Sequence, residues 1–334
     1  MLHSANNLRN EYNDYLIIVN PAQTLKQQIK IHRFSHDAMA TVFEILIAHD
    51  DERYAKQAAH EAFQIVDKLE QDLSRFIENS DISRINRLKS GEKTRVGGDT
   101  YQCLIQCVDL YAITGGYFDV SVGHLMEAWL DDSKHSLQPS THELELSLAL
   151  TGLHHLQFDD TAEEITVLHG PVHLDLGGIG KGYAVDSMSL LLQEWELRDY
   201  FIHGGRSSLL ANGNQPGEDG WQVAIQPPDG VTIEPIVYML HDEAMSSSGL
   251  EKGQHIINPY QGKPIAAKKA AWAVAASATN ADALSTAFML MPMEKIEQFI
   301  EKYKAFGGML IEYNEKKPVV HTFGQWYAEP ASAS

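Results

Sequence analysis

The chain has little cysteine and little positive charge. Its two cysteines, Cys103 and Cys107, have no second pair or histidine at zinc-ligand spacing, so we expect small apolar core residues rather than a zinc site. With 26 Lys and Arg against 45 Asp and Glu, the formal net charge is −19, and the largest basic cluster is the pair Lys268 and Lys269. Polyanion binding requires clustered basic side chains, and we therefore expect no nucleic-acid partner.

The sequence also lacks a long apolar run and a lipid-attachment cysteine near its N-terminus. The apolar patch Leu16–Val19 is too short for export or for crossing a bilayer. We therefore expect no membrane insertion and a cytoplasmic location. Because no Pro- or Gly-rich linker divides the 334 residues, we interpret residues 31–327 as one domain. A partly ordered N-terminal extension, 1–30, would precede it, and a disordered tail, 328–334, would follow.

The segment 270–291, AAWAVAASATNADALSTAFMLM, reads as an apolar strand, a turn of small residues and a helix. Helical positions four apart lie on one face, so the Asp282 carboxylate and the Thr286 hydroxyl can reach a common point. Both groups are oxygen donors of the kind that Mg²⁺ prefers. The alternative is ordinary helix N-terminal chemistry, with Thr279 or Asn280 as the cap and Asp282 favoured by the helix dipole.

A second segment, 165–192, combines alternating apolar residues with a glycine-rich loop and a helix. The alternation on either side of residues 169–170 predicts a β-hairpin over 165–176. The glycines that follow would let backbone N–H groups approach a phosphate, and Lys181 adds a positive charge. The loop fits neither the Walker pattern nor the dinucleotide fingerprint, so tight turns and close packing are the alternative explanation. Its glycines are Gly177, Gly178, Gly180 and Gly182.

The strings DLGGIGKGYAVD (175–186) and ATNADALSTA (278–287) resemble the paired signatures of the ApbE family, the FAD:protein FMN transferases. Four further segments resemble blocks of that family in the same order, which extends the similarity over about residues 32–323. These segments are AMATVF (38–43), LSRFIENSDISRIN (73–86), GGYFDVSVGHLMEAW (115–129) and GQHIINPYQGKP (253–264).

The resemblance implies that the FMN moiety of FAD is transferred to a Ser or Thr hydroxyl of an acceptor flavoprotein, with release of AMP. It also implies an α+β fold with two lobes of mixed sheet and helices around a central cleft for FAD and a metal. The metal would be Mg²⁺, with Mn²⁺ as the alternative, held by the Gly178 carbonyl, Asp282 and Thr286. His255 is the candidate that accepts the proton of the attacking hydroxyl.

By the same resemblance, eleven residues fall where the family holds FAD. Purely structural roles stay open for some of them, since Phe76 and Phe118 could be core aromatics and Asp119 could cap a helix over 122–129. The eleven are Met39, Phe76, Tyr117, Phe118, Asp119, Asp175, Lys181, Gly204, Gly205, Ser248 and Ile256.

The chain departs from the family pattern at Leu250 and Phe76, which do not touch the metal, and at two positions that bear on activity. Arg206 replaces an aspartate after Gly204 and Gly205, which exchanges an acceptor for a cation. Asn258 replaces an aspartate near His255, which removes a charge that could tune the histidine. Two other functions therefore stay open: a pyrophosphatase that splits FAD into FMN and AMP, and a non-catalytic FAD-binding protein. The sequence identifies neither the acceptor nor the oligomeric state, whether monomer or homodimer.

The remaining pattern predicts a mixed architecture. Apolar stripes at helical spacing predict helices over 55–73, 100–114 and 293–304. Short apolar or alternating runs predict strands near 42–48, 200–204, 207–212, 221–226, 236–241 and 308–313.

Overall fold

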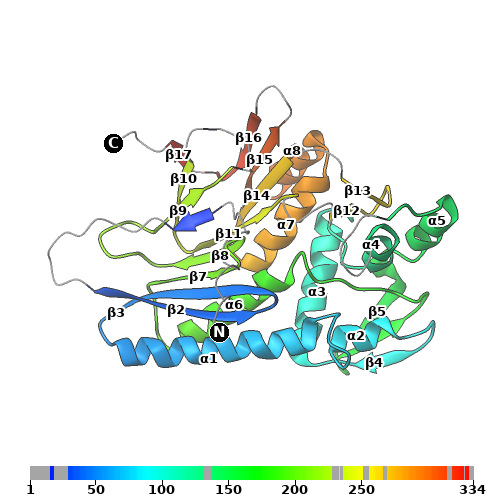
Figure 1. The fold of residues 1–334 in the computed structure, drawn as a ribbon, viewed down its shortest axis with the longest axis horizontal. Coiled ribbons are helices and arrows are strands. Elements are labelled where there is room, and N and C mark those ends of the chain that lie inside the picture. Colours follow the sequence, from blue (N-terminus) through cyan, green and yellow to red (C-terminus); the bar gives the residue numbers. More distant parts are fainter. Residues whose placement is uncertain are drawn as a thin grey trace, which may run out of the picture.

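The computed structural model describes residues 16–18, 29–130, 137–227, 233, 236–250, 256–265, 269–313, 318–326 and 328–330. Its centre is an eight-stranded antiparallel sheet in the order β16-β15-β14-β11-β8-β7-β3-β2 (Figure 1). The strands are β2 (Lys30–Ala38), β3 (Thr41–His49), β7 (Tyr200–Gly204), β8 (Ser208–Asn212), β11 (Glu243–Ser248), β14 (Lys269–Ala275), β15 (Gly307–Tyr313) and β16 (Pro318–Gly324).

Both faces of the sheet are buried in its middle, which explains why strands such as β3, β7 and β14 are apolar at most positions. Successive side chains of a strand point to opposite faces. In β7, Tyr200 and Ile202 enter the core beneath the helices, whereas Phe201 enters a second core on the other face. In β14, Ala271 and Ala273 face the helices and Trp272 faces the second core. The alanines leave room for a helix to pack closely on this strand.

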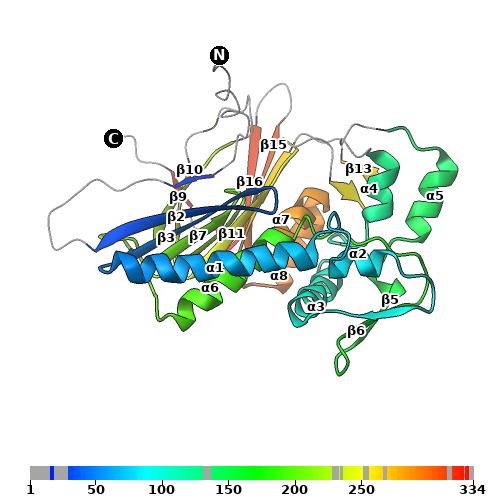
Figure 2. The same cartoon turned by 60° about the horizontal axis from the view of Figure 1, so that its bottom comes forward.

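Helices cover one face of the sheet. Helix α7 (Ala278–Leu290) packs on β11 and β14, α6 (Gly180–Glu194) packs on β7 and β8, and α1 (Glu52–Leu73) packs on α6 and β2. In Figure 2, α1 crosses the near side of the sheet. Helix α8 (Met293–Lys302) contacts β16 at the sheet's edge. The apolar stripe predicted for 55–73 is buried in this layer through residues that include Ala62, Val66 and Leu69.

A four-stranded sheet in the order β1-β9-β10-β17 lies against the other face and closes the second core. Its strands are β1 (Leu16–Ile18), β9 (Trp221–Ile225), β10 (Ile236–Leu240) and β17 (Ala328–Pro330). The tail that we expected to be disordered from residue 328 therefore begins with a strand, because its backbone pairs with β10. The N-terminal extension likewise contributes β1, which pairs with β9.

A smaller group of elements lies beside one end of the large sheet (Figures 1 and 2). It contains a three-stranded sheet, β4-β6-β5, and a two-stranded one, β12-β13. The buried Cys103 and Cys107 lie in α3, which confirms their role as core residues. The elements are α2 (Asp81–Asn86), β4 (Lys93–Arg95), α3 (Gly98–Ile113), α4 (Gly123–Trp129), α5 (Thr141–Ala149), a 3-10 turn (Leu153–His155), β5 (Leu156–Asp159), β6 (Glu164–Val167), β12 (Ile257–Asn258) and β13 (Lys263–Pro264).

The α+β fold class is confirmed, as are the predicted helices and strands, but the hairpin over 165–176 is wrong. Strand β6 pairs with β4 and β5 instead. Residues 172–176 form only an isolated parallel bridge, between His173 and Val122. Val172 and Leu174 are fully buried, so the alternation reflected burial of alternate side chains and not a ladder with β6. Within the described residues, no helix is long and apolar enough to cross a membrane.

Candidate metal and flavin site

The N-terminal ends of α6 and α7 meet and cap each other. Asp186 of α6 accepts hydrogen bonds from the backbone N–H groups of Ala278 and Thr279, at 2.7 and 2.8 Å, where α7 begins. In return, Asp282 of α7 accepts one from the backbone N–H of Gly182, at 2.8 Å, in the first turn of α6. A Cβ atom on Gly182 would lie 2.3 Å from the Ala278 carbonyl oxygen. Only glycine permits this approach, which brings the two predicted segments together.

The three residues predicted to hold the metal lie near this junction. A Cβ atom built on Gly178 would lie 3.4 Å from the Thr286 hydroxyl oxygen, so the glycine loop passes directly over that side chain. The Thr286 hydroxyl lies 3.3 Å from the Asp282 carbonyl oxygen and 3.2 Å from the Ser248 hydroxyl. Ser277, rather than Thr279 or Asn280, is the N-cap of α7, and its hydroxyl accepts from the Asn280 N–H. A favourable interaction with the dipole of α7 therefore does not fully explain Asp282, because its carboxylate also contacts α6 and β8.

Asp282 is buried, with 4% of its side chain exposed, and several donors surround its carboxylate. The Lys181 Nζ lies 3.4 Å from Oδ2, and the Ser208 hydroxyl donates to Oδ1 at 2.7 Å. Lys181 keeps 22% of its side chain exposed, so the ammonium bridges the buried carboxylate and solvent. A buried carboxylate needs such partners because ionisation away from water is costly.

The donor set fits a hard divalent cation. The Asp282 carboxylate, the Thr286 hydroxyl and the main chain at Gly178 offer oxygen atoms only, as Mg²⁺ requires. The Lys181 ammonium balances the charge of the Asp282 carboxylate. If a metal ion bound this carboxylate instead, the long flexible side chain of Lys181 would be able to turn toward an anion.

Other predicted flavin-site residues adjoin this centre. The Phe118 ring is buried and lies 3.4 Å from the position of a Cβ on Gly178. Asp175 pairs with Arg75, whose Nε lies 2.5 Å from the carboxylate. The Arg75 guanidinium stacks 4.4 Å from the ring centre of Phe76, and Phe76 is 77% exposed. The core-aromatic alternative therefore holds for the burial of Phe118 but is wrong for Phe76, which presents a ring to solvent.

Two tight turns of the large sheet lie side by side, the turn between β2 and β3 and the turn after β7. Met39 and Ala40 join β2 to β3 with φ angles of 50° and 56°, and Gly205 and Arg206 follow β7 with 60° and 56°. The Gly205 N–H donates to the Val42 carbonyl at 2.9 Å. Left-handed backbone is unfavourable for side chains other than Gly, Asn and Asp. Three of these four residues thus hold a costly conformation, a feature that is common at functional sites.

The segment around β12 packs against Tyr117, another residue predicted to bind the flavin. The Asn258 side-chain oxygen accepts from the N–H groups of Tyr260 and Gln261, at 2.9 and 3.1 Å. Tyr260 packs edge-on against Tyr117, with ring centres 5.0 Å apart. Asparagine and aspartate can both accept these bonds, so the departure at 258 preserves the turn. Ile256 is buried nearby, whereas His255 lies outside the described residues.

Asp119 does not cap α4. Its carboxylate accepts from the backbone N–H and the hydroxyl of Ser121, at 2.8 and 2.6 Å. Burial raises the pKa of Asp119 above its ordinary 3.8, and the bonds from Ser121 oppose that rise. The Asp175 N–H donates to the Val120 carbonyl at 2.7 Å, which ties the Asp119 turn to the loop that carries Asp175.

A cavity of about 660 Å³ lies on the other side of the α6–α7 junction, between α3, α6, α7 and β8. Asp186, Ser189 and Asn280 are among the residues that line it, and none of the predicted metal donors does. We place the candidate site at the surface formed by Gly178, Lys181 and Thr286, because the predicted metal ligands and the lysine lie there and do not line this cavity.

Sequence reasoning missed three contributors to the site. Ser208 donates to Asp282, Ser285 contacts Ser248 through their hydroxyls at 2.8 Å, and Arg75 pairs with Asp175. Ser208 and Arg75 come from segments far from their partners in sequence, so no local pattern joins them. Ser285 lay within the motif, but its neighbour Thr286 carried the metal prediction.

Residues 39–309 match the family model described as the ApbE family, and the chain belongs to that family.

The relatives agree. The chain is 27% identical to the FAD:protein FMN transferase of Vibrio cholerae over 257 residues, which cover 72% of this chain and 75% of the relative. It is 26% identical to the Haemophilus influenzae protein of the same name over 296 residues, covering 83% and 85%. The crystal structure of the Pseudomonas stutzeri flavinyl transferase ApbE in its apo form superposes with a TM-score of 0.80 at 23% identity, covering 89% of this chain and 95% of that one. The ApbE protein of Thermotoga maritima gives 0.76 at 24% identity, covering 89% and 97%.

Proposed function

We propose that this protein is an FAD:protein FMN transferase, which moves the FMN moiety of FAD onto a Ser or Thr hydroxyl of an acceptor flavoprotein and releases AMP. The observation that carries the proposal is the meeting of the Gly178 loop with Thr286 and Asp282, within a chain whose relatives bear that name.

In this proposal, Mg²⁺ or Mn²⁺ is held by the Gly178 carbonyl, the Asp282 carboxylate and the Thr286 hydroxyl. When bound, such an ion neutralises charge that builds on phosphate oxygens during transfer. Ser208 supports the assignment, because its hydroxyl fixes one Asp282 oxygen at 2.7 Å and so orients the carboxylate.

The residues around the donors suit a diphosphate and an isoalloxazine ring. Lys181 stands at the start of α6, where its charge and the helix N-terminus both attract a phosphate. Phe76 offers an exposed ring for stacking, and Arg75 holds it in place. His255 remains our candidate to accept the proton of the attacking hydroxyl, whose own pKa is far above neutral pH.

The test is an incubation of the protein with FAD, Mg²⁺ and a candidate acceptor, followed by detection of AMP, free FMN and fluorescent acceptor on a denaturing gel. AMP together with labelled acceptor supports transfer. AMP with free FMN and no labelled acceptor would indicate FAD pyrophosphatase activity, and bound intact FAD would indicate a carrier. Either of the last two outcomes would refute the proposed transfer.

Variants at the donors test the metal assignment. Asp282→Ala should abolish metal-dependent AMP release, and Thr286→Ala should raise the Mg²⁺ concentration needed for half-maximal rate. Asp109→Ala is the matched control, because it removes an exposed carboxylate of α3 and should leave the Mg²⁺ dependence unchanged. An unchanged Mg²⁺ dependence in Asp282→Ala would contradict the assignment.

A further inference from the structure

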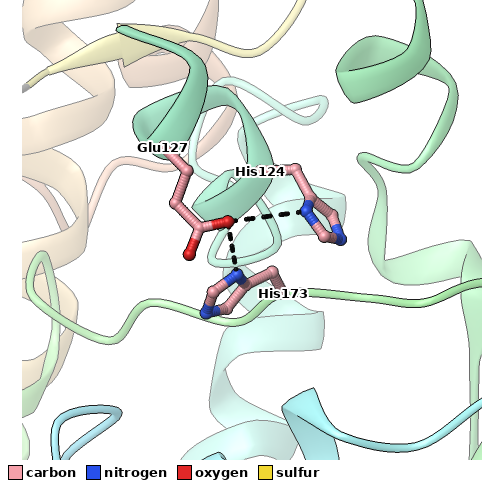
Figure 3. A group of neighbouring side chains, drawn as sticks. All are labelled: His124, Glu127 and His173. Carbon is pink, nitrogen blue, oxygen red and sulfur yellow. Dashed lines mark ion pairs between the residues drawn. The ribbon is translucent and has the colours of Figure 1, made fainter. Parts of the chain in front are cut away.

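A group of side chains with the chemistry of metal ligands is formed by residues other than the proposed donors. His124 and Glu127 lie on α4, and His173 lies on the segment that leads toward Asp175 (Figure 3). One ligand atom from each of the three residues lies within 4.8 Å of the other two. A Glu127 oxygen is 3.0 Å from the His173 Nδ1 and 3.7 Å from the His124 Nδ1.

The backbone holds these side chains together. His124 and Glu127 are three residues apart on a helix, so they project from one face. The Gly123 N–H donates to the His173 carbonyl at 3.0 Å, and a Cβ on Gly123 would lie 2.6 Å from that oxygen. The glycine therefore brings the start of α4 into direct contact with His173, and the three ligands come from two segments fixed to each other.

The hydrogen bonding of His124 determines which of its ring nitrogens faces the cluster. Its Nε2 lies 3.3 Å from the Pro171 carbonyl oxygen, which can only accept, so Nε2 carries the proton. In the neutral ring, Nδ1 then presents a lone pair toward the Glu127 carboxylate. Two electron-rich groups face each other favourably only with a cation between them, whether a proton or a metal ion. A carbonyl bond to the distal nitrogen is the usual support for a metal-bound histidine.

We propose that His124, Glu127 and His173 bind a divalent transition-metal ion of the zinc class. Two imidazoles and one carboxylate suit zinc, whereas the all-oxygen preference of Mg²⁺ excludes it here. Ligands of a tetrahedral ion bound at about 2.0–2.2 Å lie about 3.3–3.6 Å apart. The Glu127 separations of 3.0 and 3.7 Å are close to this range, and the two histidine ligand atoms lie within 4.8 Å of each other, so side-chain rotations would bring the three into place.

The fourth position of the ion faces solvent. The Glu127 side chain is 50% exposed, whereas those of His124 and His173 are 21% and 19% exposed. Water would fill this position. The ion would clip α4 to the segment that carries Asp175, and so stiffen the wall of the flavin site without touching the substrate.

The experiment is a calorimetric titration of metal-free protein with Zn²⁺ in excess Mg²⁺, which saturates the all-oxygen site. We expect one Zn²⁺ per chain, and visible ligand-field absorption when Co²⁺ replaces it. Affinity should fall at least about tenfold in Glu127→Gln and further in His173→Ala, since each removes a ligand. His60→Ala, which removes an exposed histidine of α1, should bind as the wild type does.

Glu127→Gln keeps the size of a half-exposed side chain, and its melting temperature without metal, compared with that of the wild type, shows whether folding is intact. Asp282→Ala should keep the Zn²⁺ site, which separates this proposal from the proposed function. The proposal is overturned if the wild type takes up no stoichiometric Zn²⁺, or if Glu127→Gln and His173→Ala bind it as tightly as His60→Ala. Those results would leave the three residues as a proton-linked cluster only.

Discussion

Asp186 holds the start of α7, and its removal should destabilise the protein strongly. In Asp186→Ala, the backbone N–H groups of Ala278 and Thr279 lose the acceptor that they contact at 2.7 and 2.8 Å. Both residues are fully buried. An unsatisfied buried donor costs about 1–3 kcal/mol. Burial also raises the pKa of Asp186, so the wild type already bears a desolvation cost that alanine relieves. We expect a net loss of about 2–4 kcal/mol in the free energy of unfolding.

Denaturant unfolding followed by circular dichroism measures this loss, with Asp109→Ala as the control. Asp109 is an exposed aspartate of α3, and its removal should cost within about 0.5 kcal/mol. Asp186→Asn should fall between the two, because a carboxamide has one acceptor oxygen and can keep one of the two backbone bonds. If Asp186→Ala unfolds at the same denaturant concentration as Asp109→Ala, the reciprocal capping of α6 and α7 contributes no stability and the reasoning fails.

Three further predictions concern groups held in unfavourable environments. Burial raises the pKa of Glu243 from 4.5 to about 7 against a hydrogen bond from Tyr238, so the folded state binds a proton more tightly than the unfolded chain. Stability relative to Glu243→Gln should therefore be greatest below pH 4.5 and fall by at most about 3 kcal/mol as pH rises to about 7. Unfolding curves at several pH values measure it, and parallel profiles would disprove the link. Ala40→Gly, at φ 56°, should raise the free energy of unfolding by about 0.5–1 kcal/mol, and an unchanged or lower value would show that the turn is unstrained. Arg206→Asp should tighten FAD binding about tenfold in a fluorescence titration, since an acceptor is restored where φ is 56°, whereas weaker binding would mark Arg206 as an adapted contact.

Local pattern was sufficient to predict the longer helices and the most apolar strands, but not the edge strands β2 and β16 of the large sheet. The stripe of Ala62, Val66 and Leu69 predicts α1 because helical periodicity survives wherever one face is buried. Strands β3, β7, β8, β14 and β15 were recognisable because both faces of the sheet are covered there, which leaves short, dense apolar runs, whereas the central strand β11, which contains three serines, was missed. The same logic failed at 172–176, where Val172 and Leu174 alternate inward without a partner strand of their own. Alternation reports which side chains are buried and is silent on which backbone lies alongside.

The residues of the candidate site also fall into two groups, those that the sequence could indicate and those that only the folded structure reveals. Asp282 and Thr286 could be proposed from sequence because helical spacing puts them on one face, and Gly178 could be proposed from the resemblance to the ApbE family. Ser208, which fixes Asp282, and Arg75, which pairs with Asp175, could not, because each reaches its partner only through tertiary packing.

The histidine cluster marks the limit of sequence reasoning most clearly. The spacing of His124 and Glu127 is visible in the sequence, but two ligands on one turn of helix are common without a metal. What makes the pair chemically unusual is His173, placed beside it by the contact between Gly123 and the His173 carbonyl. That contact requires a glycine where α4 begins, and this glycine lies in the segment GGYFDVSVGHLMEAW, which the sequence analysis had assigned to the family resemblance. A motif assigned to one function can thus conceal a residue that the fold uses to build a second site.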